Sequence, residues 1–266
     1  MSVKNKKEKN LSVVINTYNE AHHIRDCILS VQKFADEIVV SDMESEDGSA
    51  KIAEELGCIV FSCKKLPAGE YTLIERIKRA NGKWVLMLDP DMRVPEITGK
   101  KILEIIMEDY YDGATFYMRN FIFGQLCNHG HGSQGKFFKL FRRSNFIENI
   151  EMGMGISFGI KHQLSKGKIL DLSPEFYIEH YAYNDMYTMF AQHLRYADTI
   201  AREQANLGKH FSIAKLCFLP LKKFVVDVLF NKGWEDGIPG ISYTLAASSM
   251  LFFKELLLWY YSNRQK

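Results

Sequence analysis

The chain has 266 residues, 47% of them hydrophobic and 25% charged, a balance that is typical of a folded globular protein and excludes a largely disordered one. Its 34 Lys and Arg residues nearly balance its 32 Asp and Glu residues, and the resulting net charge of +2 argues against a dedicated nucleic-acid-binding protein. The five cysteines never form a Cys-x-x-Cys pair, which argues against a zinc ribbon or a disulfide framework and favours a reducing cytoplasm.

Strand-like and helix-like segments alternate from Leu11 onward, a pattern typical of βαβ units with a mostly parallel sheet. Residues 1–10 form a lysine-rich tail with no signal-peptide core behind it, so we expect the protein to stay inside the cell. The pattern predicts strands over 11–16, 37–41, 58–61 and 83–88. It predicts helices over 20–34, around 52–56 and over 71–80, with Asn19 as the cap of the first helix.

The pattern changes beyond Ile97, where a helix predicted around 100–108 precedes strand-like runs over 114–123 and 135–142. From Asn184 onward the chain is predicted to be helical, with two apolar stretches over 211–230 and 241–261. We therefore predict a basic tail over 1–10, one α/β domain over 11–183 with a mostly parallel sheet flanked by helices, and a helical C-terminal extension over 184–266.

Polar side chains follow the ends of the first, second and fourth predicted strands, at the edge where an open parallel sheet collects its ligands. These side chains are Thr17, Tyr18, Glu20, Asp42, Asp89 and Asp91. The turn after the first strand contains no glycine, so no backbone cradle can approach a pyrophosphate. This argues against a dinucleotide-dependent enzyme and against a sugar-nucleotide pyrophosphorylase.

Asp89-Pro90-Asp91 places two carboxylates one residue apart at the end of a buried strand. Such a pair can hold a divalent ion that bridges the phosphate oxygens of a diphosphate. The alternative for an isolated Asp-x-Asp is an ordinary solvated turn. The polar first strand end, Asn-Thr-Tyr-Asn-Glu, lies upstream in the same sheet and strengthens the metal interpretation.

The chain contains, in this order, the blocks LSVVINTYNEAHHIRDCILSV (11–31), ADEIVVSDMESEDGS (35–49) and GKWVLMLDPDMRV (82–94). Together these blocks resemble the family 2 glycosyltransferases with the GT-A fold. Later blocks, over 119–145, 179–201 and 233–240, resemble the subgroup that adds glucose or a similar sugar to the inner core of lipopolysaccharide. The resemblance implies a GT-A, Rossmann-like sheet with a donor half over 11–118 and an acceptor half over 119–183.

The resemblance implies a nucleotide-sugar donor, and UDP-glucose is the one we expect. Thr17, Tyr18 and Glu20 would contact the nucleoside, with the Tyr18 ring stacking on it. Asp42 would accept a hydrogen bond from the uracil ring, with a turn residue as the alternative. Asp47 is expected to be a structural turn and helix-start residue and not a ligand.

The resemblance also implies a divalent metal cofactor, Mn or Mg, held by Asp89, Asp91 and His180. For His180 the alternative is a packed, hydrogen-bonded histidine. Arg76 is expected to contact the phosphate or the base of the donor, with a solvated helix face as the alternative.

An inverting transfer needs one carboxylate to take the proton from the attacking acceptor hydroxyl. Glu151 matches the glutamate of the resembling subgroup and is the expected catalytic base, with Glu148 as the runner-up and a surface carboxylate as the alternative for both. His129 and His131 lie in a glycine-flanked loop that is expected to border the acceptor. Asp236 is expected either on the acceptor side or in a helix-joining turn.

Charges interrupt both apolar C-terminal stretches, so we expect neither stretch to span a membrane. Lys215, Lys222 and Lys223 lie among aromatic and aliphatic residues, a mixture that fits a helix in the interface of an anionic membrane. The location would then be the inner face of the cytoplasmic membrane. The alternative is a helical pair packed on the α/β domain or on another subunit, which leaves a homo-oligomer open.

These expectations combine into a metal-dependent, inverting glycosyltransferase that moves a sugar, expected to be glucose, from a UDP-sugar to a cell-envelope glycan. The acceptor would be a glycan or a lipid-linked glycan such as the lipopolysaccharide core. A transferase with a protein or peptide acceptor is one alternative, because its donor half would look the same. A non-catalytic scaffold that binds a sugar nucleotide is the other.

Overall fold

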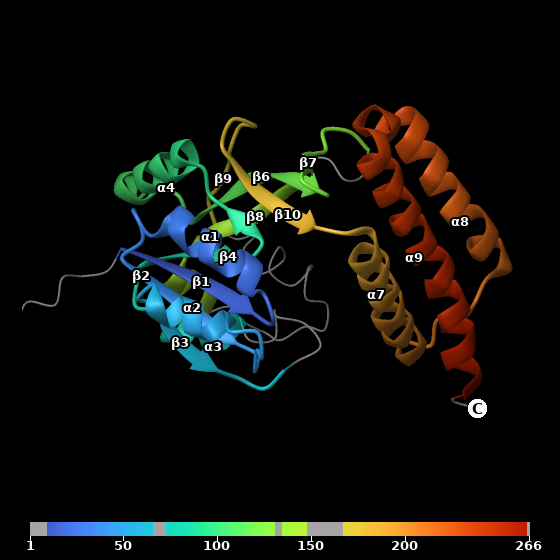
Figure 1. The fold of residues 1–266 in the computed structure, drawn as a ribbon, viewed down its shortest axis with the longest axis horizontal. Coiled ribbons are helices and arrows are strands. Elements are labelled where there is room, and N and C mark those ends of the chain that lie inside the picture. Colours follow the sequence, from blue (N-terminus) through green and yellow to red (C-terminus); the bar gives the residue numbers. More distant parts are fainter. Residues whose placement is uncertain (1–9, 66–72, 131–134, 148–166, 265–266) are drawn as a thin grey trace, which may run out of the picture. The chain divides into compact units, whose positions relative to one another are not determined.

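The computed structural model describes residues 10–65, 73–130, 135–147 and 167–264. The chain divides into two compact units (Figure 1). The first, which we call the sheet unit, comprises the residues up to Met118 together with Lys136–His180. The second, which we call the helical unit, comprises Arg119–Gly135 together with Tyr181–Lys266.

One mixed sheet contains ten strands of the described residues. The strands are β1 (Leu11–Thr17), β2 (Glu37–Asp42), β3 (Ile59–Ser62), β4 (Trp84–Leu88), β5 (Met92–Arg93), β6 (Gly113–Ile122), β7 (Gln125–Leu126), β8 (Gly135–Arg142), β9 (Ile169–Asp171) and β10 (Tyr177–Tyr183). Their order is β3-β2-β1-β4-β8-β6-β10-β5, with β7 and β9 paired to β6. The strands β3, β2, β1 and β4 are parallel neighbours, and β8 joins β4 in the antiparallel sense. The predicted α/β class and its parallel strands are confirmed.

Helices cover both faces of the parallel strands, because alternate side chains of a buried strand point to opposite faces and both must be packed. The helices of the sheet unit are α1 (Ala21–Val31), α2 (Ser49–Glu55), α3 (Leu73–Arg79), α4 (Glu96–Glu108) and α5 (Arg143–Ile147). On β1, the fully buried Leu11, Val13 and Ile15 pack with residues of α1, α2 and α4. The intervening Val14 packs with α3 on the other face.

The start of α1 differs from the prediction. Asn19 has a φ of 54° and lies before the helix, and its side chain bonds to the loop after β2 instead of capping α1. Residues that follow β2 bond the backbone N–H groups of this helix start: Ala21 N donates to Asp47 Oδ2 in that loop at 2.8 Å, and Glu20 N donates to Oγ of Ser49, the first residue of α2, at 2.8 Å. The prediction of Asn19 as the cap is therefore wrong, while the structural role predicted for Asp47 is confirmed.

The helical unit consists mainly of long helices, as predicted from Asn184 onward. They are α7 (Met186–Asn206), α8 (Ile213–Val225), a π-helical turn η2 (Val226–Phe230), a 3₁₀ turn η3 (Gly233–Asp236) and α9 (Gly237–Arg264). Side-chain oxygens cap two of them: Asp185 accepts from Thr188 N at 2.8 Å, and Ser212 accepts from Lys215 N at 3.4 Å. The helix α9 packs against both α7 and α8.

The helical unit takes in residues that precede the predicted extension. The strands β6 and β10 both begin in the sheet unit and end in the helical unit. Ile122, Cys127 and Tyr183, which lie at or near these strand ends, are buried together with Met189 of α7 and Ala246 of α9. The ends of the two strands therefore belong to the core of the helical unit.

Candidate functional site

The polar strand ends singled out in the sequence lie at one edge of the sheet. Thr17 at the end of β1 is paired in register with Asp42 at the end of β2, and Ile15 of β1 is paired with Leu88 of β4. The turn at Asp89 begins directly after Leu88. The carboxyl ends of three neighbouring parallel strands thus bring their polar residues together, at the place where open α/β sheets bind ligands.

Thr17 and Asp42 carry buried oxygen atoms without a hydrogen-bond partner among the residues that the structure describes. Thr17 is fully buried, and its Oγ1 has no such partner. Asp42 is 5% exposed; its Oδ2 accepts from Ser45 N at 3.1 Å, but its Oδ1 has no described partner. A buried polar group left without a partner costs about 1–3 kcal/mol, so these two atoms have hydrogen-bonding capacity that a bound ligand could use.

Tyr18 follows Thr17 and is partly buried. The ammonium of Lys65, which follows β3, lies 3.8 Å from the centre of the Tyr18 ring, a cation–π contact. One face of the ring is therefore covered by a positive charge in this structure. Stacking of a nucleobase on Tyr18, as the family resemblance implies, would use the other face or displace Lys65.

Asp89 is held by a lysine that the sequence analysis did not single out. Lys139 lies on β8, is 6% exposed, and donates from Nζ to Asp89 Oδ2 at 3.1 Å. Arg76 on α3 is 2% exposed, so the alternative of a solvated helix face is wrong. The side chain of Asp89 is 51% exposed, but the protein packed around it removes enough water to raise its pKa; the charge and hydrogen bond of Lys139, followed by the charges of Arg76 and His180, outweigh this and hold the pKa below its ordinary value. Asp89 is therefore ionised and fixed by a cationic neighbour.

Asp91 and His180 are brought together from distant parts of the chain. His180 lies on β10, paired in register with Met92 of β5, and its Nε2 is 3.2 Å from Asp91 Oδ2. Burial lowers the pKa of His180, but the charge and hydrogen bond of Asp91 outweigh it and raise the pKa above its ordinary value. The other carboxylate oxygen of Asp91, Oδ1, is buried and has no partner among the described residues.

This donor set fits a divalent metal ion. Carboxylate oxygen is the ligand that Mg²⁺ and Mn²⁺ favour, and imidazole nitrogen is a common further ligand of transition metals. The buried Oδ1 of Asp91 offers an unused lone pair, and His180 lies within hydrogen-bond distance of the same carboxylate. Asp89 fits less well, because its Oδ2 is already bonded to Lys139. Asp91 and His180 are thus the two residues best arranged to hold a metal.

Glu20, at the start of α1, faces the same carboxylates. Burial, followed by the negative charges of Asp91, Asp47 and Asp89, raises the pKa of Glu20 from its ordinary 4.5 to about 7. Glu20, His22 and His23 also offer ligand atoms that all lie within 4.8 Å of one another. The concentration of negative charge around Asp91 is a further sign that this edge of the sheet suits a cation.

Arg93 is a second site residue that the sequence analysis missed. Its Nη1 donates to the backbone oxygens of Pro90 and Met92, both at 2.9 Å, and its Nη2 lies 3.5 Å from Asp26 on α1. These contacts brace the turn that carries Asp89 and Asp91. The sequence signal for Arg93 is weak, because a basic residue after a turn is usual on protein surfaces.

The acceptor-side predictions fall partly outside the described residues. Glu151, Glu148 and His131 all lie there. Asp236 is 4% exposed in the helical unit, where its carboxylate accepts from His129 N at 2.7 Å and lies 3.0 Å from His129 Nδ1. Asp236 therefore fastens the loop that follows β7 to η3, which is the structural role of a helix-joining turn.

Comparisons with known proteins extend these observations to a family. The model of glycosyl transferase family 2 matches residues 12–162, more than half of the chain. An uncharacterized glycosyltransferase of Rickettsia bellii (strain RML369-C) is 39% identical over 84 residues, which cover 31% of this chain and 28% of that protein. The match thus spans less than a third of the curated relative.

Two solved structures resemble the whole chain at low sequence identity. The S. aureus protein TarS, residues 1–349, is 18% identical with a TM-score of 0.53, and the similarity covers 96% of this chain and 91% of that one. The mannosyltransferase PcManGT from Pyrobaculum calidifontis, solved with GDP-Man and Mn²⁺, is 13% identical with a TM-score of 0.57, covering 95% and 88%. The fold matches that of GT-A glycosyltransferases, and the chain belongs to glycosyltransferase family 2.

Proposed function

We propose that this protein transfers a hexose, glucose in the first instance, from a UDP-sugar to a cell-envelope glycan, with inversion at the anomeric carbon and with a divalent metal, Mn or Mg, as cofactor. The observation that carries this proposal is the pair Asp91 and His180, in which the buried Oδ1 of Asp91 has no partner among the described residues, at the edge where β1, β2 and β4 end. Solvated turn residues would not leave such an atom buried.

The donor would lie over the ends of β1 and β2. Thr17 and Asp42 each have a buried oxygen that lacks a described partner, and these atoms would bond to the nucleoside. Asp42 would accept from the N–H of a uracil ring, which is the basis for proposing UDP. The mannosyltransferase PcManGT was solved with GDP-Man, so the choice of base is tested directly in the experiment below.

The diphosphate would lie beside Asp91. Asp91 and His180 would hold the metal, which supplies positive charge that stabilises the leaving diphosphate. Arg76 and Lys139, both at least nine-tenths buried, add two fixed cations close by. Asp89 stays ionised between them and, being half-exposed, can accept a hydrogen bond from a sugar or ribose hydroxyl.

Glu151 remains our proposed base. It would take the proton from the acceptor hydroxyl as that oxygen attacks the anomeric carbon, so no covalent intermediate with the enzyme is required. Glu151→Gln is expected to lower kcat by about 10²- to 10⁴-fold with little change in UDP affinity. Glu148→Gln is the matched control. The opposite pattern, with Glu148→Gln inactive and Glu151→Gln fully active, would transfer the role to Glu148.

The donor site is tested by calorimetric titration of UDP with and without manganese. Asp91→Asn is expected to abolish the manganese-dependent part of UDP binding, a loss of about 100-fold or more, while the melting temperature stays near that of the parent. Glu54→Gln, an exposed carboxylate of α2, is the matched control. Undiminished manganese-dependent binding by Asp91→Asn would overturn the metal site.

Turnover separates this proposal from a non-catalytic scaffold. A panel of UDP- and GDP-sugars is incubated with the protein, and release of the nucleotide is measured with and without a chelator. Chelator-sensitive hydrolysis of one UDP-sugar supports the proposal. Binding of nucleotide with no hydrolysis or transfer of any sugar would favour the scaffold.

The cell-envelope acceptor is proposed from the resemblance of 119–145, 179–201 and 233–240 to the lipopolysaccharide inner-core subgroup. Mass spectrometry of envelope glycans from cells with and without the gene tests it. A glycan that lacks one hexose in the deletion strain supports the proposal. An unchanged glycan profile together with a protein that loses a hexose would instead favour a protein acceptor.

A further inference from the structure

The helix α8 presents an apolar surface to solvent. None of its residues is buried, and Phe218 and Leu221, which lie three residues apart and therefore on one side of the helix, are 70% and 62% exposed. Ile213 in its first turn is 65% exposed. A helix that buries so little of its own apolar surface is not stabilised by the core of its unit alone.

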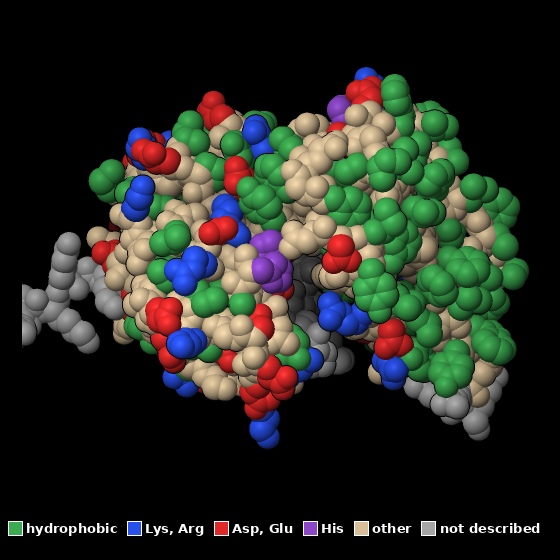
Figure 2. Space-filling view, viewed as in Figure 1, with side chains coloured by type: hydrophobic (Ala, Val, Ile, Leu, Met, Phe, Trp, Pro, Cys, Tyr) green, Lys and Arg blue, Asp and Glu red, His purple; other side chains and the backbone are tan. Residues whose placement is uncertain are grey.

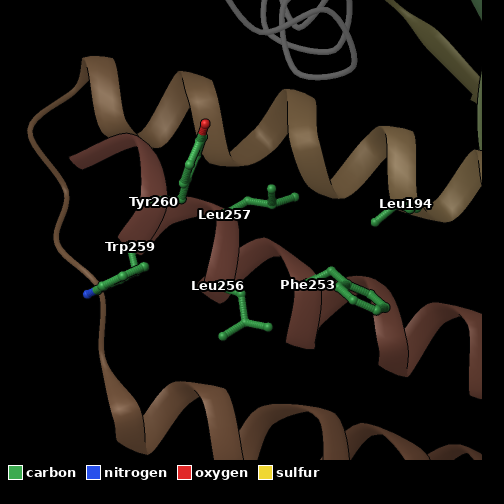
Figure 3. A pocket seen from close by; sticks show the side chains of 6 residues that line it. All are labelled: Leu194, Phe253, Leu256, Leu257, Trp259 and Tyr260. Carbon is green, nitrogen blue, oxygen red and sulfur yellow. The ribbon is translucent and has the colours of Figure 1, made fainter. Parts of the chain in front are cut away.

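The neighbouring helix α9 has a matching apolar side. Leu245, Phe252, Leu256 and Trp259 recur at helical spacing and are 37% to 54% exposed. In Figure 2 hydrophobic side chains gather over the region of α8 and α9. An apolar groove of about 410 Å³ runs along α9, and Figure 3 shows the side chains that line it, from α9 and from Leu194 of α7. The exposed apolar residues thus form a continuous surface on two packed helices.

The charges on this surface have one dominant sign. Among the described residues of α8 and α9, the exposed charged side chains are Lys215 and Lys222. The acidic residue of α9, Glu255, is 1% exposed and is paired with Lys254 at 2.8 Å. Lys215 and Lys222 lie within about one turn of Phe218, so the apolar strip carries a basic border. Such a surface is complementary to a sheet of negative charge above a hydrocarbon layer.

Lys223 does not belong to that border, which corrects the sequence-based expectation. Its side chain is 18% exposed, and its ammonium pairs with the buried Asp227 at 2.7 Å. The pair lies inside the helical unit. Lys223 therefore stabilises the turn from α8 into η2 and is not available to a membrane.

The alternative that α9 crosses a membrane is less well supported. The segment Gly233–Asn263 is long and apolar enough for that, with a mean hydropathy of 1.3, but 44% of its most apolar window is buried within the protein. At its C-terminal end Tyr261 hydrogen-bonds to Asp198 of α7 and lies 4.3 Å below the guanidinium of Arg202. A spanning α9 would bring these charged groups toward the hydrocarbon or break their contacts.

We propose that the apolar surface of α8 and α9 rests on an anionic lipid bilayer, with Phe218, Leu221 and the aromatic residues of α9 in the headgroup region and with Lys215 and Lys222 at the anionic lipids. Trp259 and Tyr260, which are 54% and 39% exposed, are of the types that favour the membrane–water interface. A second copy of the chain fits less well, since it would present the same basic border and no exposed acid on these helices.

Co-sedimentation of the full chain with vesicles tests the proposal. Phosphatidylglycerol-containing vesicles are expected to pellet the protein, pure phosphatidylcholine vesicles to pellet much less, and 1 M salt to release most of the bound fraction. Phe218→Ser with Leu221→Ser is expected to lower the partition coefficient about 10- to 100-fold. Lys215→Gln with Lys222→Gln is expected to lower it about 10- to 30-fold.

Matched double variants on the sheet unit serve as controls and should leave the partition coefficient unchanged. Ile97→Ser with Met107→Ser removes two exposed apolar side chains, and Lys33→Gln with Lys51→Gln removes two exposed lysines. Equal pelleting with both vesicle types, or none with either, would overturn the proposal. So would a dimer in analytical ultracentrifugation that Phe218→Ser with Leu221→Ser dissociates while vesicle binding stays the same. Nucleotide-sugar turnover is measured in parallel without vesicles, so a failure of the donor site is separable from a failure of this surface.

Discussion

The sheet unit and the helical unit place their large apolar side chains differently. In the sheet unit, Ile28, Trp84 and Leu86 are fully buried between the strands and the helices that cover them. In the helical unit, Phe218 and Trp259 are 70% and 54% exposed although they belong to strongly apolar stretches. An apolar stretch therefore does not by itself identify a core element. The direction in which each side chain leaves its helix or strand decides whether it stabilises the fold or forms a contact surface.

The largest effect is expected from paired tryptophan substitutions in the two units. Trp84→Ala should lower the free energy of unfolding by about 3–5 kcal/mol, because the indole is fully buried in β4. Trp259→Ala should lower it by less than about 1 kcal/mol, because more than half of that side chain is already in water. Urea unfolding followed by circular dichroism measures both. Equal losses would mean that the outer side of α9 is a core in solution, and the comparison would fail.

Each unit also contains a buried lysine that is paired with a carboxylate: Lys139 in the sheet unit and Lys254 in the helical unit. Removing the two ion pairs tests whether the two units differ in stability and in binding. Glu255→Gln should cost about 3 kcal/mol of unfolding free energy, because it leaves the buried ammonium of Lys254 without an opposite charge beside it. Lys139→Met should cost about 1 kcal/mol or less, because its partner Asp89 is half-exposed and water can replace the lost bond. The same substitution should weaken UDP binding about tenfold or more, as a fixed cation beside the donor site is lost.

Lys78→Met, an exposed lysine of α3, is the matched control for these variants. Urea unfolding and calorimetric titration of UDP are run on all three proteins. If Lys139→Met loses as much stability as Glu255→Gln and keeps its UDP affinity, the lysine of the sheet unit is structural too. The proposed difference between Lys139–Asp89, a pair that serves binding, and Lys254–Glu255, a pair that serves stability, would then be wrong.

The smallest effect is expected from Glu20 and depends on pH. The pKa of Glu20 is raised from 4.5 to about 7, so between these values the folded state binds more protons than the unfolded state. Glu20 therefore lowers the stability as the pH rises from about 4.5 to 7. With a chelator present, Glu20→Gln should be more stable than the parent by about 1–2 kcal/mol at pH 8 and about equal at pH 4. Thermal unfolding at both pH values measures this, and an equal difference at the two pH values would exclude the raised pKa.

Much of the sheet unit could be predicted, because local patterns determine it. Short strand-like runs between helix-like segments located β1 to β4, and the polar residues after them placed Thr17, Asp42 and Asp91 at one edge. The carboxyl ends of neighbouring parallel strands lie at the same edge of a sheet, so the strand prediction alone places these residues together. The burial of Arg76 was left open, since two faces of a short helix are hard to distinguish from sequence alone.

Two of the misses share one physical cause, which is contact between residues far apart in the chain. The backbone N–H groups at the start of α1 donate to Asp47 and Ser49, which follow β2, so the sequence around Asn19 could not show which residues cap this helix. Lys139 reads as one basic residue in an apolar strand, and it becomes informative only once β8 lies beside β4 and Asp89. The pairing of Lys223 with Asp227 is closer in sequence, at i and i+4, and could have been predicted from that spacing.

The passage of β6 and β10 from one unit into the other determines how the protein can be cut. Deleting 184–266 would leave Ile122, Cys127 and Tyr183 on the remaining chain without Met189 and Ala246, which cover them. A truncated donor domain of this kind is therefore expected to aggregate. Exchanging the helical unit between relatives would need three junctions, after Met118, after Gly135 and after His180. The last of these junctions falls inside β10, directly after the histidine that pairs with Asp91, so a chimera built there takes Asp91 and His180 from one parent and the rest of β10 from the other.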